Sequence, residues 1–195
     1  KAVSTFQQRI SDLNAEEDEI ESIYNEALHA MAGVGINISN MYIALYNPQR
    51  QQITFPLAYE EGRRLTEAEK AQTELYRTAP FGQHGSVAEW VMKMWQLARR
   101  REAMLINYDF KQWARRQGIR IFPTNTKAWL GAPMIFNEQL VGMIGLRSSS
   151  DEEIFKESHK ELLEIIASQA AIAITNARLY AESQGQIKEL RALNA

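Results

Sequence analysis

The sequence predicts an α+β fold built around an antiparallel sheet. Three observations lead to this fold class. Helix-like and strand-like segments come in groups rather than as repeated βαβ units, two pairs of strand-like segments have the pattern of hairpins, and capping boxes mark helix starts. With 195 residues, 45 % hydrophobic and 24 % charged, the chain has the length of one domain or two very small ones and can bury a real core.

The first predicted helix begins after Ser4, which forms a capping box with Gln7. One side of this helix carries a row of mainly apolar residues, the seam, which recur in alternating steps of four and three. This is heptad spacing, with one charged residue in the row. Gly33 and Gly35 are expected to end this helix. The seam consists of Phe6, Ile10, Leu13, Glu17, Ile20, Tyr24, Ala27 and Met31.

A first hairpin is predicted at residues 40–60, where two β-rich runs flank a polar turn. Pro56 cannot donate to a strand ladder, so its strand is expected to be an edge or to carry a bulge there. A helix from about Glu67 to Arg77 follows, with a capping box formed by Thr66 and Glu69.

In the second half of the chain, the sequence pattern predicts three helices and three strands. Ser86 opens a helix, a short strand follows at residues 103–107, and a short helix ends at Gly118. Residues 128–147 predict a second hairpin, which is richer in apolar residues and is therefore expected to be more central in the sheet. Ser158, in a capping box with Glu161, is expected to open the last helix.

Composition excludes several classes of protein. The formal net charge of −2 gives no bulk affinity for nucleic acid. The absence of cysteine excludes disulfides, thiolate metal sites, cysteine nucleophiles and thioether-linked chromophores. Purely apolar runs are far shorter than the ~20 residues that span a bilayer, and there is no signal peptide, so we expect a cytoplasmic protein without direct membrane insertion. The missing initial methionine suggests a piece of a longer protein.

No catalytic or metal-binding constellation is visible in the sequence. His29 and His159 fall in predicted helices without a second ligand at i+4, and His84 falls in a glycine-rich loop where solvent exposure is the expectation, with metal or haem ligation as the alternative. No HExxH, GxSxG or P-loop pattern occurs. The sequence therefore predicts a protein that is not an enzyme and has no metal site.

Four stretches together carry a family resemblance: "SVAEWVMKMWQ", "LINYDF", "TKAWLGAPMIFNEQLVGMIGLRSS" and "IFKESHKELLEIIASQAAIAITNARLY". In this order and spacing, residues 20–183 resemble the GAF domain of bacterial signalling proteins such as sensor histidine kinases, cyclases and transcriptional regulators. The resemblance implies a sheet of five to six antiparallel strands. It also implies that the N- and C-terminal helices cover one face and that middle helices and loops enclose a small-molecule pocket on the other.

The resemblance also suggests which residues line the pocket. On the strand at 41–46, Ile43 and Leu45 share the face suited to the helix layer, so the tyrosine face is expected to look toward the pocket. Residues 93–127 hold nine basic and two acidic residues, an excess of seven positive charges that favours an anionic or polar ligand. The candidate pocket residues are Tyr42, Tyr46, Trp90, Trp113, Arg116 and Trp129.

Special subclasses of the family do not fit this sequence. GAF domains that attach a bilin covalently, and the GAF-type reductase of free methionine sulfoxide, both need cysteines, and none is present. The Asn-Lys…Phe…Asp-Glu signature of the cyclic-nucleotide class is also missing, so cyclic nucleotide binding is not expected. The ligand therefore stays unknown at this stage.

The terminal helices are expected to carry the signal. Residues 1–19 are predicted to be an N-terminal signalling-helix extension, and residues 184–195 a C-terminal linker helix leading to an effector domain of the same polypeptide. In the last helix, Ala167, Ala170, Ala171 and Ala173 are expected to allow close approach to the sheet, with Ile165, Ile166, Ile172 and Ile174 filling the gaps.

A homodimer through the terminal helices is the expected assembly, parallel or antiparallel. Asn176 falls at a seam position if Ile165, Ile172 and Leu179 face the partner, and the alternative is an Asn that simply faces solvent. Three functions compete: a sensor that binds a small molecule, a ligand-free dimerising spacer, and an enzyme. The predicted signalling positions are Phe6, Ile10, Leu13, Ile20, Asn176 and Leu179.

Overall fold

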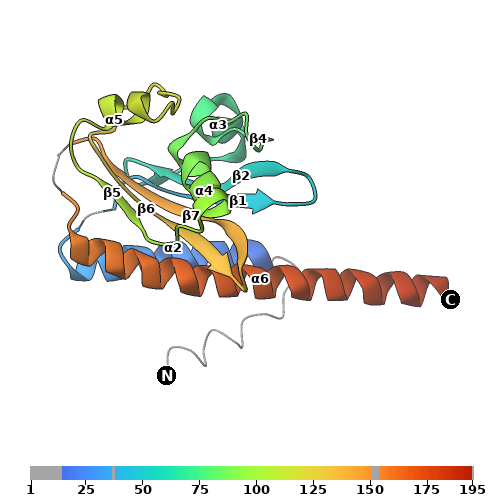
Figure 1. The fold of residues 1–195 in the computed structure, drawn as a ribbon. Coiled ribbons are helices and arrows are strands. Elements are labelled where there is room, and N and C mark those ends of the chain that lie inside the picture. Colours follow the sequence, from blue (N-terminus) through green and yellow to red (C-terminus); the bar gives the residue numbers. More distant parts are fainter. Residues whose placement is uncertain (1–14, 37, 151–153, 195) are drawn as a thin grey trace.

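The computed structural model describes residues 15–36, 38–150 and 154–194. Within these ranges one antiparallel sheet is covered by helices on both faces (Figure 1). The elements in chain order are α2 (Ala15–Gly33), β1 (Met41–Asn47), β2 (Gln52–Glu60), β3 (Arg63–Arg64), α3 (Glu67–Gln72), the 3-10 helix η1 (Glu74–Tyr76), β4 (Ala79–Pro80), α4 (Val87–Ala98), β5 (Met104–Ile106), α5 (Phe110–Arg116), β6 (Ala128–Phe136), β7 (Gln139–Ser148) and α6 (Glu157–Leu193).

The strands lie in the order β3-β2-β1-β7-β6-β5, and β4 pairs with β2. Every pairing is antiparallel, which confirms the α+β class and the predicted sheet. The sheet has seven strands in the described part of the chain, because the two-residue strands β3 and β4 add to the expected five or six. Strands β1 and β7 share the centre, so the second hairpin is no more central than the first, contrary to the prediction.

Helices α2 and α6 lie side by side on one face of the sheet (Figure 1). Small side chains let α6 approach the strands closely, as predicted, and Ala167, Ala170 and Ala171 are almost completely buried there. Ile166 and Ile174 fill the gaps between them. The same role predicted for two other isoleucines is wrong, because Ile165 is 58 % and Ile172 44 % exposed on the outer side of α6.

The described half of the N-terminal seam is buried within the protein itself. Ile20, Tyr24, Ala27 and Met31 all belong to the core between the sheet and the two helices, and the Tyr24 ring stacks on Tyr59 with centroids 3.8 Å apart. No partner chain is needed to cover this part of the seam, which corrects the expectation that Ile20 faces a dimer partner. Three of the other four predicted seam positions, Phe6, Ile10 and Leu13, lie outside the described residues.

The opposite face of the sheet carries α3, η1, α4 and α5 (Figure 1). The predicted alternation on β1 is confirmed: Ile43 and Leu45 join the core under α2 and α6, whereas Tyr42, Ala44 and Tyr46 belong to the core on this opposite face. A single sheet therefore separates two hydrophobic cores, one on each of its faces.

A bulge forms in β2 at the position predicted from proline. The register between β1 and β2 shifts between Ile43 and Leu45, so that Phe55 and Pro56 together face one residue of β1. Lys70 on α3 is buried, and its ammonium group donates to the carbonyl oxygens of Phe55 and Pro56, each at 2.9 Å. The lysine thus binds backbone oxygens where the bulge disturbs the ladder.

Two predicted helices differ in detail from the structure. The capping box of Thr66 is confirmed, but the helix expected as far as Arg77 breaks at Thr73, which has an extended backbone, into α3 and η1. The last helix begins at Glu157 rather than after Ser158, because the His159 imidazole accepts a hydrogen bond from the Lys156 amide at 2.9 Å. The imidazole nitrogen of His159 takes the role that the predicted capping box gave to the carboxylate of Glu161.

Candidate functional site

Two aromatic rings form the floor of a cavity on the face opposite α2 and α6. Tyr42 of β1 lies over Gly145 of β7, and Trp129 of β6 lies over Gly131 of the same strand. A Cβ atom at Gly145 would stand 2.3 Å from the Tyr42 ring, and one at Gly131 would stand 2.2 Å from the Trp129 ring. Only glycine therefore lets both rings lie flat on the sheet.

The floor is fixed by a hydrogen bond as well as by packing. The Trp129 indole N–H donates to the Tyr42 hydroxyl oxygen at 3.1 Å, and both side chains are almost fully buried. Burial raises the pKa of the Tyr42 hydroxyl, so the phenol keeps its proton at neutral pH. Because its oxygen already accepts from the indole, the phenolic proton is left to bind another acceptor.

The walls come from α4, α5 and the segment that follows α5. Val87 on α4, Phe110 and Lys111 on α5, and residues 119–126 line the cavity above Trp129. The volume open to the centre of a water-sized sphere is about 30 Å³, which is room for about two ordered waters at ~10–15 Å³ each. The cavity is thus small in this conformation because the aromatic floor occupies much of the space.

A buried arginine on β7 supplies charge at the cavity wall. Arg147 pairs with Trp129 across β6 and β7, and its side chain is only 5 % exposed. Its Nη2 donates to Glu60 and, at 3.2 Å, to the Tyr76 hydroxyl, which in turn donates to Glu60 at 2.5 Å. Burial raises the pKa of Tyr76 as well, so this hydroxyl remains a donor.

The loop between β4 and α4 is organised by a buried carboxylate. Glu89 accepts from the amides of Gly82 at 2.5 Å, Gly85 at 2.7 Å and His84 at 3.3 Å. Ser86 caps α4 as predicted, by accepting from the Glu89 amide, but the Glu89 carboxylate serves the loop instead of completing a capping box. With its oxygens engaged in this way, Glu89 is structural.

His84 is buried rather than solvated, which corrects the expectation from the sequence. Its ring lies between Phe55, with centroids 5.0 Å apart, and Phe122, at 5.4 Å. Within the described part of the chain, neither ring nitrogen has a hydrogen-bond partner of good geometry. Burial lowers the pKa of His84, so the imidazole is neutral at pH 7 and packs as a ring against the inner end of the cavity wall.

The sequence-predicted pocket residues fall into three groups. Tyr42 and Trp129 form the cavity floor. Tyr46 lies on the same sheet face but outside the cavity, where it contacts Phe81 and accepts from Gln51. Trp90 and Trp113 pack edge to face at 5.5 Å and join α4 to α5, also outside the lining.

Arg116 does not reach the cavity. It is exposed at the end of α5 and is absent from the lining, so the basic residue proposed from the sequence is replaced by Arg147, which sequence reasoning missed. One signal was available: in "GMIGLRSS", strand alternation places Arg147 on the same face as Met143 and Gly145, which is unusual for a charge in an apolar strand.

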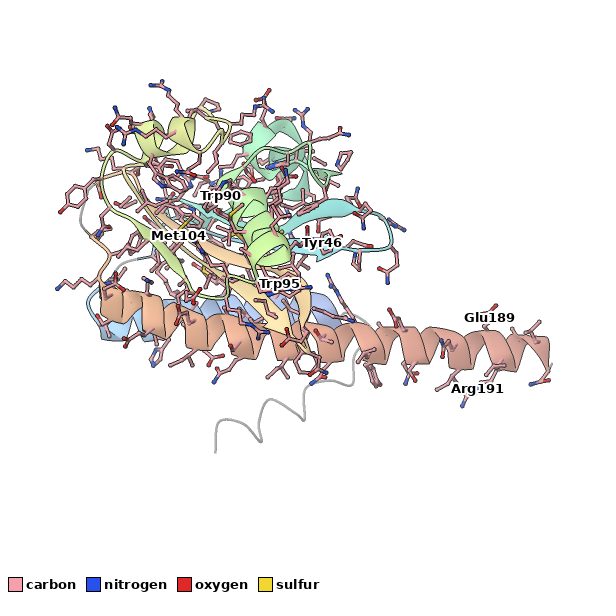
Figure 2. All side chains as sticks on the ribbon, viewed as in Figure 1. Tyr46, Trp90, Trp95, Met104, Glu189 and Arg191 are labelled. Carbon is pink, nitrogen blue, oxygen red and sulfur yellow. The ribbon has the colours of Figure 1, made fainter. Side chains whose placement is uncertain are left out.

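The far end of α6 leaves the domain. All residues from 181 to 194 are exposed, and the helix continues well past the sheet, with Glu189 and Arg191 far from other elements (Figure 2). Asn176 is exposed on the outer side of the helix. A row of exposed apolar residues, the α6 stripe, follows the same side, and it consists of Ile165, Ile172, Leu179, Leu190 and Leu193.

Helix α6 also satisfies a simple test for membrane spans. Among the described residues it is the one helix long and apolar enough to cross a bilayer, judged by length and composition only. Of the apolar stretch, 44 % is buried inside the protein. Such burial is typical of a core helix, and the helix does pack on the sheet.

Solved structures share this architecture. The GAF domain from an Acinetobacter phosphoenolpyruvate-protein phosphotransferase is 14 % identical over 90 % of this chain and 92 % of its own, with a TM-score of 0.62. Residues 122 to 287 of a methyl-accepting chemotaxis protein are 15 % identical over 92 % and 98 %, with a TM-score of 0.61. A GAF domain/HD domain protein from Geobacter sulfurreducens is 13 % identical over 88 % and 99 %, with a TM-score of 0.56.

At these identities the structures show a common fold, and curated proteins gave no match to the sequence. The family is shown by the sequence itself, because the model of the GAF domain matches residues 17–175, most of the chain. The antiparallel sheet, the paired helices on one face and the cavity on the other agree with that match. The chain belongs to the GAF domain family.

Proposed function

We propose that this chain is the sensory and regulatory GAF domain of a larger bacterial signalling protein, of the histidine kinase, cyclase or regulator type. It binds a small molecule in the cavity above Trp129 and passes the change through its terminal helices to an effector domain. The proposal rests on one observation: the cavity and α6 lie on opposite faces of the same two strands, β6 and β7.

The route from cavity to helix is short. Trp129 and Arg147 are paired across β6 and β7 and face the cavity, whereas their neighbours Leu130 and Leu146 face the core that contains α6. A ligand that shifts Trp129 or Arg147 therefore moves strands on which α6 packs directly. The signal leaves the domain along the exposed end of α6, residues 184–195, toward the effector domain.

The assembly we propose is a homodimer held by the terminal helices. Along α6, heptad spacing links two sets of positions. The first set is 165, 172, 179, 186 and 193, which are seven residues apart. The second set is 169, 176, 183 and 190, which lie four residues after the first four of these. An exposed helix without tertiary packing is marginal in water, and a second copy of α6 would cover the stripe. Asn176 then lies within the seam.

The domain is proposed to be cytoplasmic and non-enzymatic. The carboxylates and the histidine buried on this face of the sheet are already engaged: Glu89 binds loop amides, Glu60 binds Arg147 and Tyr76, and His84 packs between two phenylalanines. No nucleophile stands beside a base in that group. A covalent bilin has no cysteine to attach to, and nucleic acid is not a proposed partner.

A second candidate function is a ligand-free dimerising spacer. The small cavity volume favours it, because Tyr42 and Trp129 already occupy much of the space that a ligand would need. The two candidates differ in whether anything binds and whether α6 responds.

Native mass spectrometry of protein purified from cells, combined with hydrogen exchange, would distinguish the sensor from the spacer. The sensor predicts a retained small molecule, and slower exchange in α5, residues 119–126 and the 157–178 part of α6 when the molecule is present. A protein that carries no ligand, and whose exchange in α6 responds to no compound in a broad metabolite panel, would be a spacer.

A further inference from the structure

A residue of the cavity wall, Arg147, carries a buried donor without a hydrogen-bond acceptor among the described residues. The Arg147 Nη2 group binds Glu60 and Tyr76, but its Nε–H has no hydrogen-bond partner among the residues that the structure describes. The side chain is 95 % shielded from solvent and lines the cavity. Leaving a charged donor buried and unpaired is costly, so this N–H is suited to an acceptor that arrives from outside the chain.

The other polar groups around the cavity are also donors. Thr124 and Thr126 share one hydrogen bond at 3.0 Å, which leaves a hydroxyl proton, and the Tyr42 proton is free for an acceptor. Lys111 and Arg120 add positive charge nearer the surface, although Arg120 is paired with Glu74 at 2.5 Å. No carboxylate is among the described lining residues.

We propose that the ligand of this cavity is a small carboxylic acid, bound as its carboxylate to Arg147 and to the hydroxyl groups beside it. The inference rests on the proposed sensory function and names its ligand class. The carboxylate accepts from the Arg147 Nε–H and from Thr126 or Tyr42. Its apolar part packs against Phe110, Ile119 and the Trp129 ring, which line the same space.

Charge and size both favour this class over other anions. Glu60 already balances Arg147, so the inner wall suits one negative charge better than the two of a phosphate dianion. The volume of about 30 Å³ admits only a short acid without movement of the walls. A longer or aromatic acid requires α5 and residues 119–126 to move outward, a shift opposed by the contact between Trp90 and Trp113.

The test compares acids with their neutral amides. Propionate and benzoate are added to the purified protein beside propionamide, benzamide and inorganic phosphate at matched ionic strength, and thermal shift and calorimetry are measured. We expect propionate to raise the melting temperature more than benzoate does, and the amides and phosphate to leave it unchanged. Arg147→Gln should weaken acid binding by about tenfold or more, the effect of losing a charge-assisted hydrogen bond.

Two further variants keep the test decisive if Arg147→Gln folds poorly. The double variant Arg147→Gln with Glu60→Gln leaves no buried charge unpaired and should bind acids as weakly as Arg147→Gln. Thr126→Val leaves the ion pair intact and should weaken binding by a few fold. Arg115→Ala, an exposed arginine on α5 outside the lining, is the matched control and should bind acids like the wild type.

Several results would overturn the carboxylate inference. It would be contradicted if the amides or phosphate stabilised the protein as well as the acids do. It would also be contradicted if acids bound the Arg147 and Thr126 variants like the wild type, or if neither acid gave a response. A neutral compound that binds the cavity and slows exchange in α6 would refute the carboxylate while supporting the sensor. The sensor itself fails only if no compound binds or alters α6.

Discussion

The two faces of the sheet are packed with different kinds of side chains. Against α2 and α6 the core consists mainly of aliphatic residues and alanines. On the opposite face it is rich in aromatic rings and encloses the charges of Lys70, Glu89 and Arg147. Apolar packing holds one arrangement through shape, whereas each buried charge depends on particular partners. The comparison suggests a stiff face beneath α6 and an adaptable face beneath α4 and α5.

The strongest test of the stiff face uses two isoleucines on α6. Ile174 is completely buried against the sheet, whereas Ile172 is 44 % exposed in the stripe. Ile174→Ala should lower the free energy of unfolding by ~2–5 kcal/mol, because it leaves a cavity in a closely packed core. Ile172→Ala should cost well under half as much in urea titrations at low protein concentration. Equal losses would mean that the stripe is buried in solution even at that concentration.

A glycine pair tests the adaptable face. Gly145→Ala places a methyl group against the Tyr42 ring and should lower the free energy of unfolding by ~1–3 kcal/mol, with the ring displaced from the cavity floor. Gly185→Ala, where nothing lies within 4 Å of the new Cβ, should instead add up to ~1 kcal/mol of helix stability. Near-ultraviolet circular dichroism and thermal melts measure both. An unchanged tyrosine signal in Gly145→Ala would contradict the tight floor.

The outer side of α6 is tested by Asn176→Leu. A leucine here extends the apolar stripe between Ile172 and Leu179, so a dimer should gain about 1 kcal/mol per chain, and the melting temperature should rise more steeply with protein concentration. Sedimentation equilibrium measures the association directly. If Asn176 faces solvent in the working protein, association and melting stay as in the wild type.

The smallest expected effect is the response of the two faces to pH. Burial lowers the pKa of His84 on the cavity face and of His159 at the start of α6. A lowered folded pKa means that the unfolded chain binds more protons below about pH 6.5, so stability falls as the pH drops through this range. His84→Phe keeps a ring between its two neighbours and should reduce this loss between pH 7.5 and 5.5.

His159→Gln is the companion variant for the helix face. It removes the second titrating imidazole while leaving an acceptor near the Lys156 amide. Urea denaturation at both pH values should show a smaller loss of stability in each variant than in the wild type. The assignment to His84 would be wrong if His84→Phe lost as much stability on acidification as the parent protein.

The fold class and the order of helices and strands along the chain could be predicted from the sequence, because they follow from hydrophobic periodicity and from capping and turn residues. The alternation along β1, the bulge at Pro56 and the end of α2 at Gly33 each depend on neighbouring residues in the chain. The errors came where a nearby side chain took a different hydrogen-bonding role from the one that the capping pattern assigns to it. The imidazole of His159 starts α6, and Glu89 serves loop amides instead of its own helix cap.

The candidate site was only partly predictable, for a related reason. Tyr42 and Trp129 were found because aromatic side chains on inward-facing strand positions are visible in the sequence. Arg147 was missed in favour of Arg116, because basic residues were counted by segment and one strand arginine contributes little to such a count. Its importance comes from contacts with Glu60 and Tyr76, which are 87 and 71 residues away in the chain.

Lys70 on α3, whose ammonium group binds the carbonyl oxygens at the β2 bulge, can report chemically on the opening of the cavity. Amine-reagents modify only exposed, deprotonated amines, and Lys70 is 3 % exposed with its ammonium held by two carbonyls, so it reacts only while α3 is detached. Leu75, just beyond α3, lines the cavity, so the same detachment opens a cavity wall. The extent of acetylation at Lys70 relative to that at the half-exposed Lys93 therefore reports how often this cavity wall opens, and no ligand is needed for the measurement.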